Sequence, residues 1–367
     1  MTGRTDEGGD GHDEACRGPS DGDVRSEEGR STITSDVRTK PCHASAYLVR
    51  AALTAPSPYN TQPWRFVAAD HDGDIEVHAD GARRLPFSDP AGRELVISCG
   101  AALLNIRLAM RHLGFNPLIH HFPRPADPSF LARVVWGAYR RPEPEDERLF
   151  GALRHRHTVH GPFLAEPLPP WLPGLLVEQA HRAGVTLDFV SDRAGRRRLS
   201  ELVRIAEDMR RSSPGYRAEL RRWIWRPGEP RFDGIPVDGY GAHPDTTVFA
   251  GRDYAGLTCM YPQPPERRSS RSGPVAILGT DRDDPEAWLR AGEGLQRVLL
   301  EAAHHGVMAA FHTQPLEIPS LRVTTGRMLS CGAFPQVIFR LGYPPYARTM
   351  PRRQATEVLE TPGADVT

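Results

Sequence analysis

The loop Ala55-Pro-Ser-Pro-Tyr-Asn-Thr-Gln-Pro-Trp-Arg-Phe66 is the most informative stretch of the chain. Proline fixes φ and lacks a backbone donor, and the residue before a proline is pushed toward extended geometry. Three prolines here therefore predict a stiff, non-helical loop that presents Ser57, Asn60 and Gln62 from a nearly fixed backbone. Amide side chains offer donors and an acceptor, which suits a planar heterocycle with alternating carbonyl and ring N–H groups. A proline-rich turn that only connects two elements is the alternative.

Two stretches of the chain repeat one another at an offset of 192 residues. Residues 99–114 align without a gap with residues 291–306. Apolar residues recur at helical spacing in both copies, so each is predicted to be a helix with one buried stripe. The glycines that close both copies stand where a left-handed residue ends a helix. Asp89-Pro90 and Asp284-Pro285 are expected to cap the two helices at their N-termini.

Six strands are predicted around these helices, without a regular βαβ alternation, which favours an α+β fold. Two similar halves in tandem suggest a chain that reproduces a homodimer within itself, with the boundary near residues 142–147. The predicted strands are 65–69, 75–78, 131–137, 187–191, 275–278 and 336–341.

The remaining segments divide the chain further. Residues 1–40 are rich in Gly, Asp, Glu and Ser and contain no aromatic residue, so they are expected to form a disordered tail. The first half then covers 41–145 and the second half 146–360, followed by a tail at 361–367. Residues of about 205–270 fit neither half, and a long insertion is often a lid or functional loop. A surface helix pair with a solvated linker is the alternative.

A second candidate site stands at the start of the second half, where Arg156, His157, Thr158 and His160 lie close together in sequence. Guanidinium, imidazole and hydroxyl donors form the set that a phosphate requires. A metal site is a weaker alternative, because the flanking arginines would repel a cation and no carboxylate or cysteine lies near in sequence to complete a shell. A solvated basic turn is the remaining alternative.

Composition argues against several classes of function. The 367 residues carry a formal net charge of zero, which argues against a nucleic-acid or acidic-membrane partner. No apolar run reaches the roughly 20 residues needed to span a bilayer, and the N-terminal residues show no secretory signal. The 5 cysteines are dispersed and odd in number, which is typical of reduced thiols in a cytoplasmic protein.

At the proline-rich loop the chain resembles the nitroreductase-like flavoproteins, whose first half carries a Pro-Ser-x-x-Asn-x-Gln-Pro-Trp loop against the FMN ring. Position by position, Arg156, His157 and Thr158 match the Arg, basic residue and hydroxyl with which this family grips the FMN phosphate. His160 stands where the family usually has Lys or Arg, and a neutral imidazole would weaken the site above its reference pKa of about 6.5.

The end of the chain carries a third element of the resemblance. Residues 341–353 include Gly-Tyr-Pro and then Pro-Arg-Arg, as the family's closing segment does, so Arg352 and Arg353 are implied to reach the phosphate. The resemblance covers about residues 44–360. The order of motifs, the fused halves and the central insertion look most like the Acg-type FMN-binding oxidoreductases of actinobacteria.

The resemblance implies a composite site, with the FMN ring on a loop of the first half and the phosphate in a clamp of the second. One FMN per chain and a monomer that acts as a pseudo-dimer are expected. FMN would take hydride from NADH or NADPH and pass electrons to a small acceptor such as a nitroaromatic or quinone, without a catalytic acid, base or nucleophile from the protein. A non-catalytic FMN-sequestering or storage protein, its flavin covered by the insertion, is the alternative. A redox-neutral partner protein without flavin is a third possibility.

Overall fold

The computed structural model divides the chain into two compact units, residues 1–39 and residues 40–367. Everything described below belongs to the second unit. The predicted tails at 1–40 and 361–367 lie outside the described residues, as does most of the stretch 237–272. The described residues are 44–68, 73–160, 163–225, 229–236, 249, 273–329, 332–345 and 350–360.

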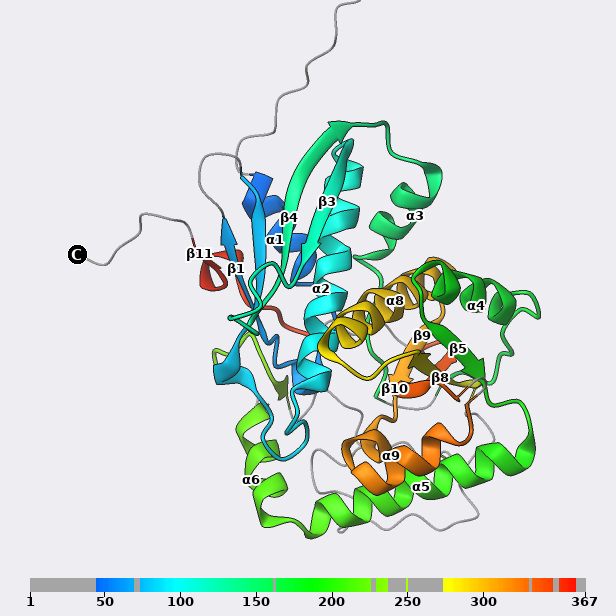
Figure 1. Ribbon diagram of the computed structural model, residues 1–367. Helices are drawn as coiled ribbons and strands as arrows, with labels where there is room; N and C mark the ends of the chain where they lie inside the picture. Colours follow the sequence, from blue (N-terminus) through cyan, green and yellow to red (C-terminus); the bar gives the residue numbers. More distant parts are fainter. Residues whose placement is uncertain are drawn as a thin grey trace, which may run out of the picture. The chain divides into compact units, whose positions relative to one another are not determined.

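Two mixed layers of helix and sheet lie on either side of a pair of long helices, α2 (Arg93–His112) and α8 (Pro285–His304) (Figure 1). One sheet has the order β11-β1-β2-β4-β3 and the other β5-β8-β10-β9. The first comprises β1 (Trp64–Ala68), β2 (Ile75–Ala79), β3 (Phe115–His121), β4 (Phe130–Tyr139) and β11 (Leu359–Glu360). The second comprises β5 (Thr186–Phe189), β8 (Val275–Thr280), β9 (Met308–Phe311) and β10 (Phe334–Gly342).

The two sheets share one topology. Apart from β11, each runs in the order first, second, fourth and third strand along the chain, and every neighbouring pair among these strands is antiparallel. In each half a long helix connects the second strand to the third. The protein is therefore an α+β fold, and the shared topology supports the predicted tandem halves.

The other helices surround these layers. The described α-helices are α1 (Ala44–Ala52), α3 (Pro144–Ala152), α4 (Leu172–Arg182), α5 (Arg193–Ser212), α6 (Pro214–Trp223) and α9 (Pro319–Gly326). Short turns of 3-10 helix are η1 (Pro58–Asn60), η2 (Gly81–Arg83), η4 (Gln314–Glu317) and η6 (Ala355–Glu357). The predicted insertion at 205–270 begins inside α5 and continues through α6, β6 (Ile224–Trp225) and β7 (Ile235–Pro236).

The two central helices cross at a pair of glycines that the sequence repeat aligns. A Cβ atom on Gly100 would lie 2.1 Å from the carbonyl oxygen of Leu289, and one on Gly292 would lie 2.0 Å from that of Ile97. Real Cβ atoms do not approach backbone oxygen so closely. Glycine at both positions therefore permits the backbone contact that joins the two halves.

Of the two predicted N-terminal helix caps, the structure confirms the one on α8 and not the one on α2. Asp284 caps α8, since its carboxylate accepts a hydrogen bond of 2.8 Å from the Ala287 amide. The predicted cap at Asp89 is wrong, because α2 begins four residues later, after Gly92 in a left-handed conformation with φ 74°. Asp89 instead accepts a hydrogen bond of 2.9 Å from the amide of Leu95, so its carboxylate satisfies the first turn of α2 from outside the helix.

Most of the predicted elements are present. All six predicted strands are found close to their expected bounds, and the glycines that end the two repeat helices, Gly114 and Gly306, have φ of 87° and 72°. The sequence did not predict β3, β9 or β11. β3 contains a proline and two histidines, and β9 and β11 are too short for a periodic pattern, so none of them carries a strong local strand signal.

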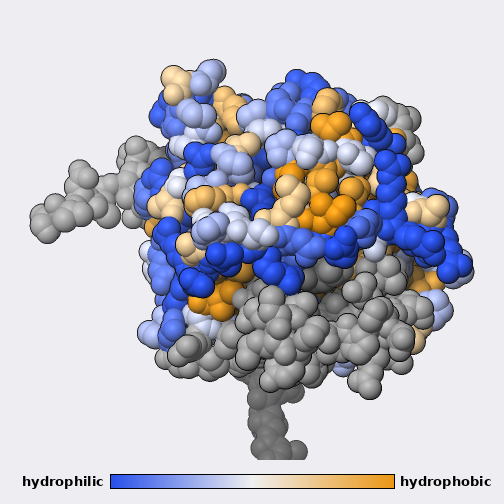
Figure 2. Space-filling model, turned by 90° about the horizontal axis from the view of Figure 1, so that it is seen from below, coloured by the Kyte–Doolittle hydropathy of each residue, from blue (hydrophilic) through white to orange (hydrophobic). Residues whose placement is uncertain are grey.

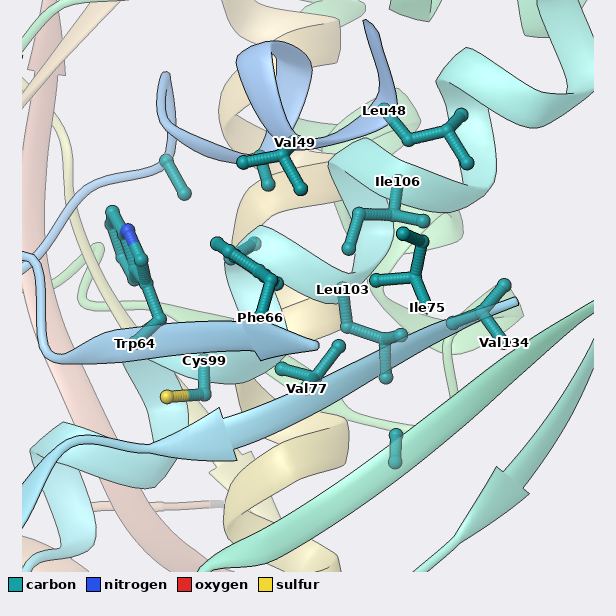
Figure 3. Packing of buried hydrophobic residues seen from close by; sticks show 14 of the residues in the cluster. Leu48, Val49, Trp64, Phe66, Ile75, Val77, Cys99, Leu103, Ile106 and Val134 are labelled. Carbon is teal, nitrogen blue, oxygen red and sulfur yellow. The ribbon is translucent and has the colours of Figure 1, made fainter. Parts of the chain in front are cut away.

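The larger hydrophobic core packs the first sheet against α1 and α2 (Figure 3). Leu48, Phe66, Val77 and Leu103 are all fully buried there. Cys99 is the one cysteine among the described residues; burial raises the pKa of its thiol, so it behaves as a small apolar side chain. A second core packs β8 and β10 against α4 and α8.

The face seen from below is largely hydrophilic, with an apolar patch surrounded by polar residues (Figure 2). In the part of the chain that the structure describes, no helix has both the length and the apolar composition to cross a bilayer.

Candidate functional site

A cavity lies between the proline-rich loop, the first turns of α2 and the strands of the second sheet. About 980 Å³ of space inside it is free of protein atoms, including a part that is open to solvent. Five of the residues predicted from the sequence line it: Ser57, Asn60, Thr158, His160 and Arg352.

The proline-rich loop is non-helical at Ser57 but its backbone is not uniformly extended. Ser57, before Pro58, is extended with φ −151° and ψ 152°. Tyr59, Asn60 and Gln62 have φ of 51°, 53° and 49°, in the left-handed region that non-glycine residues seldom adopt. Gln62 precedes a proline, so the expectation of extended geometry is wrong there. The backbone N–H of Gln62 donates a hydrogen bond of 2.9 Å to the Ser57 hydroxyl, which stabilises the tight turn. Such strain is concentrated at functional sites.

The side chain of Asn60 joins three segments of the chain. Its Nδ2 donates to the carbonyl oxygens of Gly234 at 3.1 Å and Pro351 at 3.0 Å. Its Oδ1 accepts a hydrogen bond from the guanidinium of Arg352. The amide therefore holds the insertion and the C-terminal segment against the loop.

Gln62 makes a parallel set of contacts from a fully buried position. Its Nε2 donates to the carbonyl oxygen of Phe232 at 2.7 Å, and its Oε1 accepts from the backbone amide of Arg353 at 2.9 Å. Gln62 is not among the residues that line the cavity. The amide that the sequence suggested for a ring contact is thus used to tether protein segments.

We call residues 231–236 the strap, because they are hydrogen-bonded to the proline-rich loop and contribute Ile235 to the lining of the cavity. Asp233 fixes the strap through ion pairs with Arg83 at 2.8 Å and Arg231 at 2.9 Å. Burial alone would raise the pKa of Asp233, but hydrogen bonds from the two guanidinium groups lower it below its usual value. The strap is therefore held by charge as well as by the two loop amides.

Two of the basic residues predicted from the sequence, His160 and Arg352, line the cavity, whereas Arg156, His157 and Arg353 are not among its lining residues. We define the cationic cluster as Arg156, His157, His160, Arg352 and Arg353. Burial lowers the pKa of Arg156 to about 9, assisted by repulsion from Arg352, and burial lowers that of Arg352 to about 10. Within the described residues, no carboxylate forms an ion pair with Arg156 or Arg352, so the positive charge of these two guanidinium groups is not balanced there, whereas Arg353 pairs with Glu357 at 3.8 Å.

Several nitrogen atoms of the cationic cluster lack partners. In the described part of the chain, the Nε of Arg156 and the Nη1 of Arg353 are buried donors without a hydrogen-bond partner. The Nε2 of His157 is also buried without a partner, but it is an acceptor in the neutral imidazole, because the Nδ1 faces the His155 carbonyl oxygen. The Nη2 of Arg156 donates to the carbonyl oxygen of Thr54 at 2.9 Å, which anchors the side chain. Buried donors without partners are costly, so the cluster is suited to an anion with several acceptor oxygens.

His160 differs from the family's Lys or Arg in its charge. Burial lowers the pKa of His160 to about 4, so the imidazole is neutral at pH 7 when no anion is bound. Thr158 pairs with Ala309 in a parallel bridge, and the amide of Val159 donates to the Ala309 carbonyl at 2.9 Å. This pairing holds the segment beside β9 and aims Thr158 and His160 into the cavity.

Sequence reasoning missed the residues of α2 that line the cavity. Glu94, Ile97, Ser98 and Ala101 follow helical spacing and share one face. The carboxylate of Glu94 accepts a hydrogen bond of 3.0 Å from the buried guanidinium of Arg93. The helix predicted after Asp89-Pro90 already contained these residues, but none of them was assigned to the site from the sequence. From the second half, Leu295, Phe311, Thr313 and Val337 complete the wall.

A metal site finds no support in the geometry. Among the residues that the structure describes, no group of three or more His, Cys, Asp or Glu side chains is arranged to hold a metal ion. His157 shows why the sequence pattern is misleading: its Nδ1 lies 3.0 Å from the carbonyl oxygen of His155, so this imidazole turns back toward its own chain.

The chain is similar in sequence to known proteins over most of its length. It is 32% identical over 327 residues to "Putative NAD(P)H nitroreductase Rv3131" of Mycobacterium tuberculosis, covering 86% of this chain and 92% of the relative. It is 31% identical over 328 residues to "Putative NAD(P)H nitroreductase acg" of the same organism, covering 86% and 95%. No family model matches the chain.

Solved structures give a weaker likeness. The FMN-dependent nitroreductase NfnB from Mycobacterium smegmatis, in complex with NADPH, is 17% identical with a TM-score of 0.36, covering 58% of this chain and 96% of that one. A nitroreductase with bound FMN from Desulfitobacterium hafniense is 12% identical with a TM-score of 0.35, covering 55% and 92%.

Proposed function

The chain belongs to the NAD(P)H nitroreductase family, together with the Acg proteins, and from this premise we propose that it is an FMN-dependent oxidoreductase. In this proposal NADH or NADPH supplies hydride and a small molecule such as a nitroaromatic or quinone accepts the electrons. When bound, FMN supplies the redox chemistry, accepting hydride from the nicotinamide and passing electrons on. The protein has to bind the cofactor, orient it and control access to it.

The observation that carries the proposal is the pair Arg156 and Arg352, of which Arg352 lines the cavity. Arg156 and Arg352 repel one another, and neither forms an ion pair with a carboxylate in the described part of the chain. Together with the partnerless Nη1 of Arg353, they provide a set of donors for a phosphate dianion. A dianion next to His160 would raise the pKa of its imidazole and favour the charged form.

The rest of the cavity suits a flat ring. Ile97, Ala101 and Leu295 provide apolar walls from α2 and α8. On the loop, the Ser57 hydroxyl accepts a hydrogen bond from the Gln62 amide and keeps its own O–H available to a ligand. Asn60 lies between ring and phosphate regions, because it lines the cavity and also binds Arg352. We therefore assign Ser57 and Asn60 to the ring, and the cationic cluster with Thr158 to the phosphate.

The test is anaerobic stopped-flow reduction of the FMN-loaded protein by NADH and by NADPH, followed in the flavin absorbance band. Fast bleaching by either nucleotide is the expected result. Dithionite serves as the control, since a small reductant reaches a covered ring. A protein that does not retain FMN during purification would contradict the proposal.

A second candidate function, non-catalytic sequestration of FMN, is favoured by the strap. Asn60, Gln62 and Arg83 all hold residues 231–236 to the loop, and Ile235 covers part of the cavity. If the strap stays closed, nicotinamide cannot reach the ring. A yellow protein that dithionite bleaches and neither nucleotide bleaches would favour sequestration over the oxidoreductase.

A further inference from the structure

A second cavity opens at the end of α4, against α8 and β3. About 670 Å³ of its space is free of protein atoms, including a part open to solvent. Neither the family resemblance nor the proposed function uses it. The residues that line it are Leu104, Arg107, His121, Arg182, Ala183, Glu286, Arg290, Glu293 and Arg297.

This second cavity corresponds to the first through the sequence repeat. The first cavity is lined by one face of α2 and by Thr313, which follows β9. The second cavity is lined by the matching face of α8 and by His121, the last residue of β3. Each matched pair is 192 residues apart in the chain: Glu94 and Glu286, Ser98 and Arg290, Ala101 and Glu293, His121 and Thr313.

The two cavities differ in chemistry at these matched positions. Ser98 and Ala101 leave room for a ring in the first cavity, whereas Arg290 and Glu293 bring charged side chains into the second. Further guanidinium groups reach it from α2, from the end of α4 and from the next turn of α8. The second cavity is therefore polar and charged, which does not suit an apolar ring.

Its arginines have donors that the protein does not use. A guanidinium offers five N–H donors. Arg290 forms an ion pair with Asp281 at 2.6 Å, yet its Nε is buried without a hydrogen-bond partner in the described part of the chain. Arg182 and Arg297 share the carboxylate of Glu145, at 3.1 and 2.7 Å. Arg182 also reaches Glu178 on its exposed side.

The two glutamates that face the cavity are already balanced. Glu293 accepts from Arg107 at 2.7 Å, and Glu286 pairs with Arg282 at 3.0 Å. They would therefore oppose an incoming anion less than free carboxylates would. Four guanidinium groups thus converge on a space in which unused donors remain.

We propose that this second cavity binds a small anion of the phosphate class through Arg107, Arg182, Arg290 and Arg297. The proposal stands apart from the proposed function, since it involves no flavin and none of the residues of the cationic cluster. Phosphate oxygens would accept hydrogen bonds from the partnerless Nε of Arg290 and from the remaining N–H groups of Arg107 and Arg297.

Isothermal titration with inorganic phosphate, at constant ionic strength set by chloride, tests the proposal. The full chain with Arg352→Gln is the reference, because that substitution weakens the first cavity's own phosphate site. We expect saturable binding in this background. Adding Arg290→Gln should weaken it at least about tenfold, since a charge-assisted hydrogen bond contributes about 1.5–3 kcal/mol. Adding Arg204→Gln, which breaks a similar pair on the exposed face of α5, should change nothing.

Arg107→Gln provides a second variant in case Arg290→Gln does not fold, because the Arg107 side chain is 39% exposed. Circular dichroism without phosphate checks the fold of each protein. Three results would overturn the proposal: no saturable binding in the Arg352→Gln background, equal affinity with and without Arg290, or equal losses for Arg290→Gln and Arg204→Gln.

Discussion

At the scale of single residues, the site is defined by charges that lack partners. Arg156 is 8% exposed, donates to a backbone carbonyl and is repelled by Arg352, an arrangement that costs free energy in the protein alone. Residues retained at such a cost usually serve a ligand. Two predictions concern the cationic cluster directly.

Arg352→Gln should weaken FMN binding about 10- to 100-fold, because a hydrogen bond to a charged group contributes about 1.5–3 kcal/mol. Riboflavin lacks the phosphate, so its affinity should stay unchanged. Both affinities can be measured by quenching of flavin fluorescence, with Arg204→Gln as the control. An equal loss for FMN and riboflavin would show that Arg352 does not act on the phosphate.

His160 should make the flavin-free protein less stable in mild acid. Burial lowers the pKa of His160 from 6.5 to about 4, so between these values the unfolded chain binds a proton that the folded chain does not. The free energy of unfolding therefore falls as the pH falls through this window. The free energy of unfolding should differ between pH 7 and pH 5, and His160→Gln should reduce that difference by on the order of 2 kcal/mol.

Urea unfolding at the two pH values measures this difference. His120→Gln is the matched control, because His120 is exposed on β3. If the wild type and His160→Gln show the same pH dependence, the buried neutral imidazole is not its source.

At the scale of elements, two contacts bring the site together: the crossing of α2 with α8, and the attachment of the strap. The crossing aligns the face of α2 that carries Glu94 and Ser98 with the wall formed by Leu295. The strap closes the cavity near Ile235. Each contact depends on very few residues, so each can be tested by one substitution.

Gly100→Ala should destabilise the protein by about 1–3 kcal/mol or more, because the new methyl group would lie 2.1 Å from the carbonyl oxygen of Leu289. Gly151→Ala on α3 is the control: nothing lies within 4 Å of its Cβ position, and alanine in a helix is favoured over glycine by up to about 1 kcal/mol. In thermal melts, the melting temperature should fall for Gly100→Ala and rise for Gly151→Ala, each relative to the wild type. A neutral Gly100→Ala would mean that the helices can separate without cost.

Asp233→Asn should loosen the strap and speed the release of FMN about tenfold. The substitution removes the ion pairs with Arg83 and Arg231 but keeps the size of the side chain. The release rate can be followed by the fluorescence of free flavin. Asp208→Asn, which breaks a pair with Arg204 on the exposed face of α5, should leave the rate unchanged. Unchanged release in Asp233→Asn would show that the strap is not the barrier.

At the scale of the whole molecule, the two halves have the same strand order but unequal chemistry. The loop with Ser57 and Asn60 belongs to the first half, and the clamp with Arg156 and Arg352 lies beyond the predicted boundary. In the repeat-related cavity, Arg290 takes the place of Ser98. The two sheets of shared strand order are therefore associated with two cavities of different character.

We accordingly expect one FMN per chain. The reason is that a second flavin would have to enter a cavity lined by four arginines and two glutamates. Flavin absorbance against protein concentration, together with native mass spectrometry, measures the ratio. Two flavins on one chain would contradict both the stoichiometry and the assignment of the second cavity to a small anion.

The sequence by itself determined what depends on local pattern. Helical spacing identified α2 and α8, and the glycine at each helix end took the left-handed conformation that only a residue without Cβ adopts easily. The proline-rich loop and the clusters at Arg156 and Arg352 could be found as motifs, because the residues predicted to bind the cofactor there are close together in sequence. Five of the nine predicted residues line one cavity, although they come from three distant segments.

Only the tertiary structure decided how those motifs meet. Gln62 contacts Phe232, and Asn60 contacts Arg352, across separations that no local pattern encodes. The structure also placed Glu94 in the cavity and gathered arginines from three helices in the second one. The physical reason is that amide hydrogen bonds and ion pairs form wherever packing brings their partners together. The packing in turn depends on the glycine crossing of α2 and α8, a contact between residues 192 positions apart.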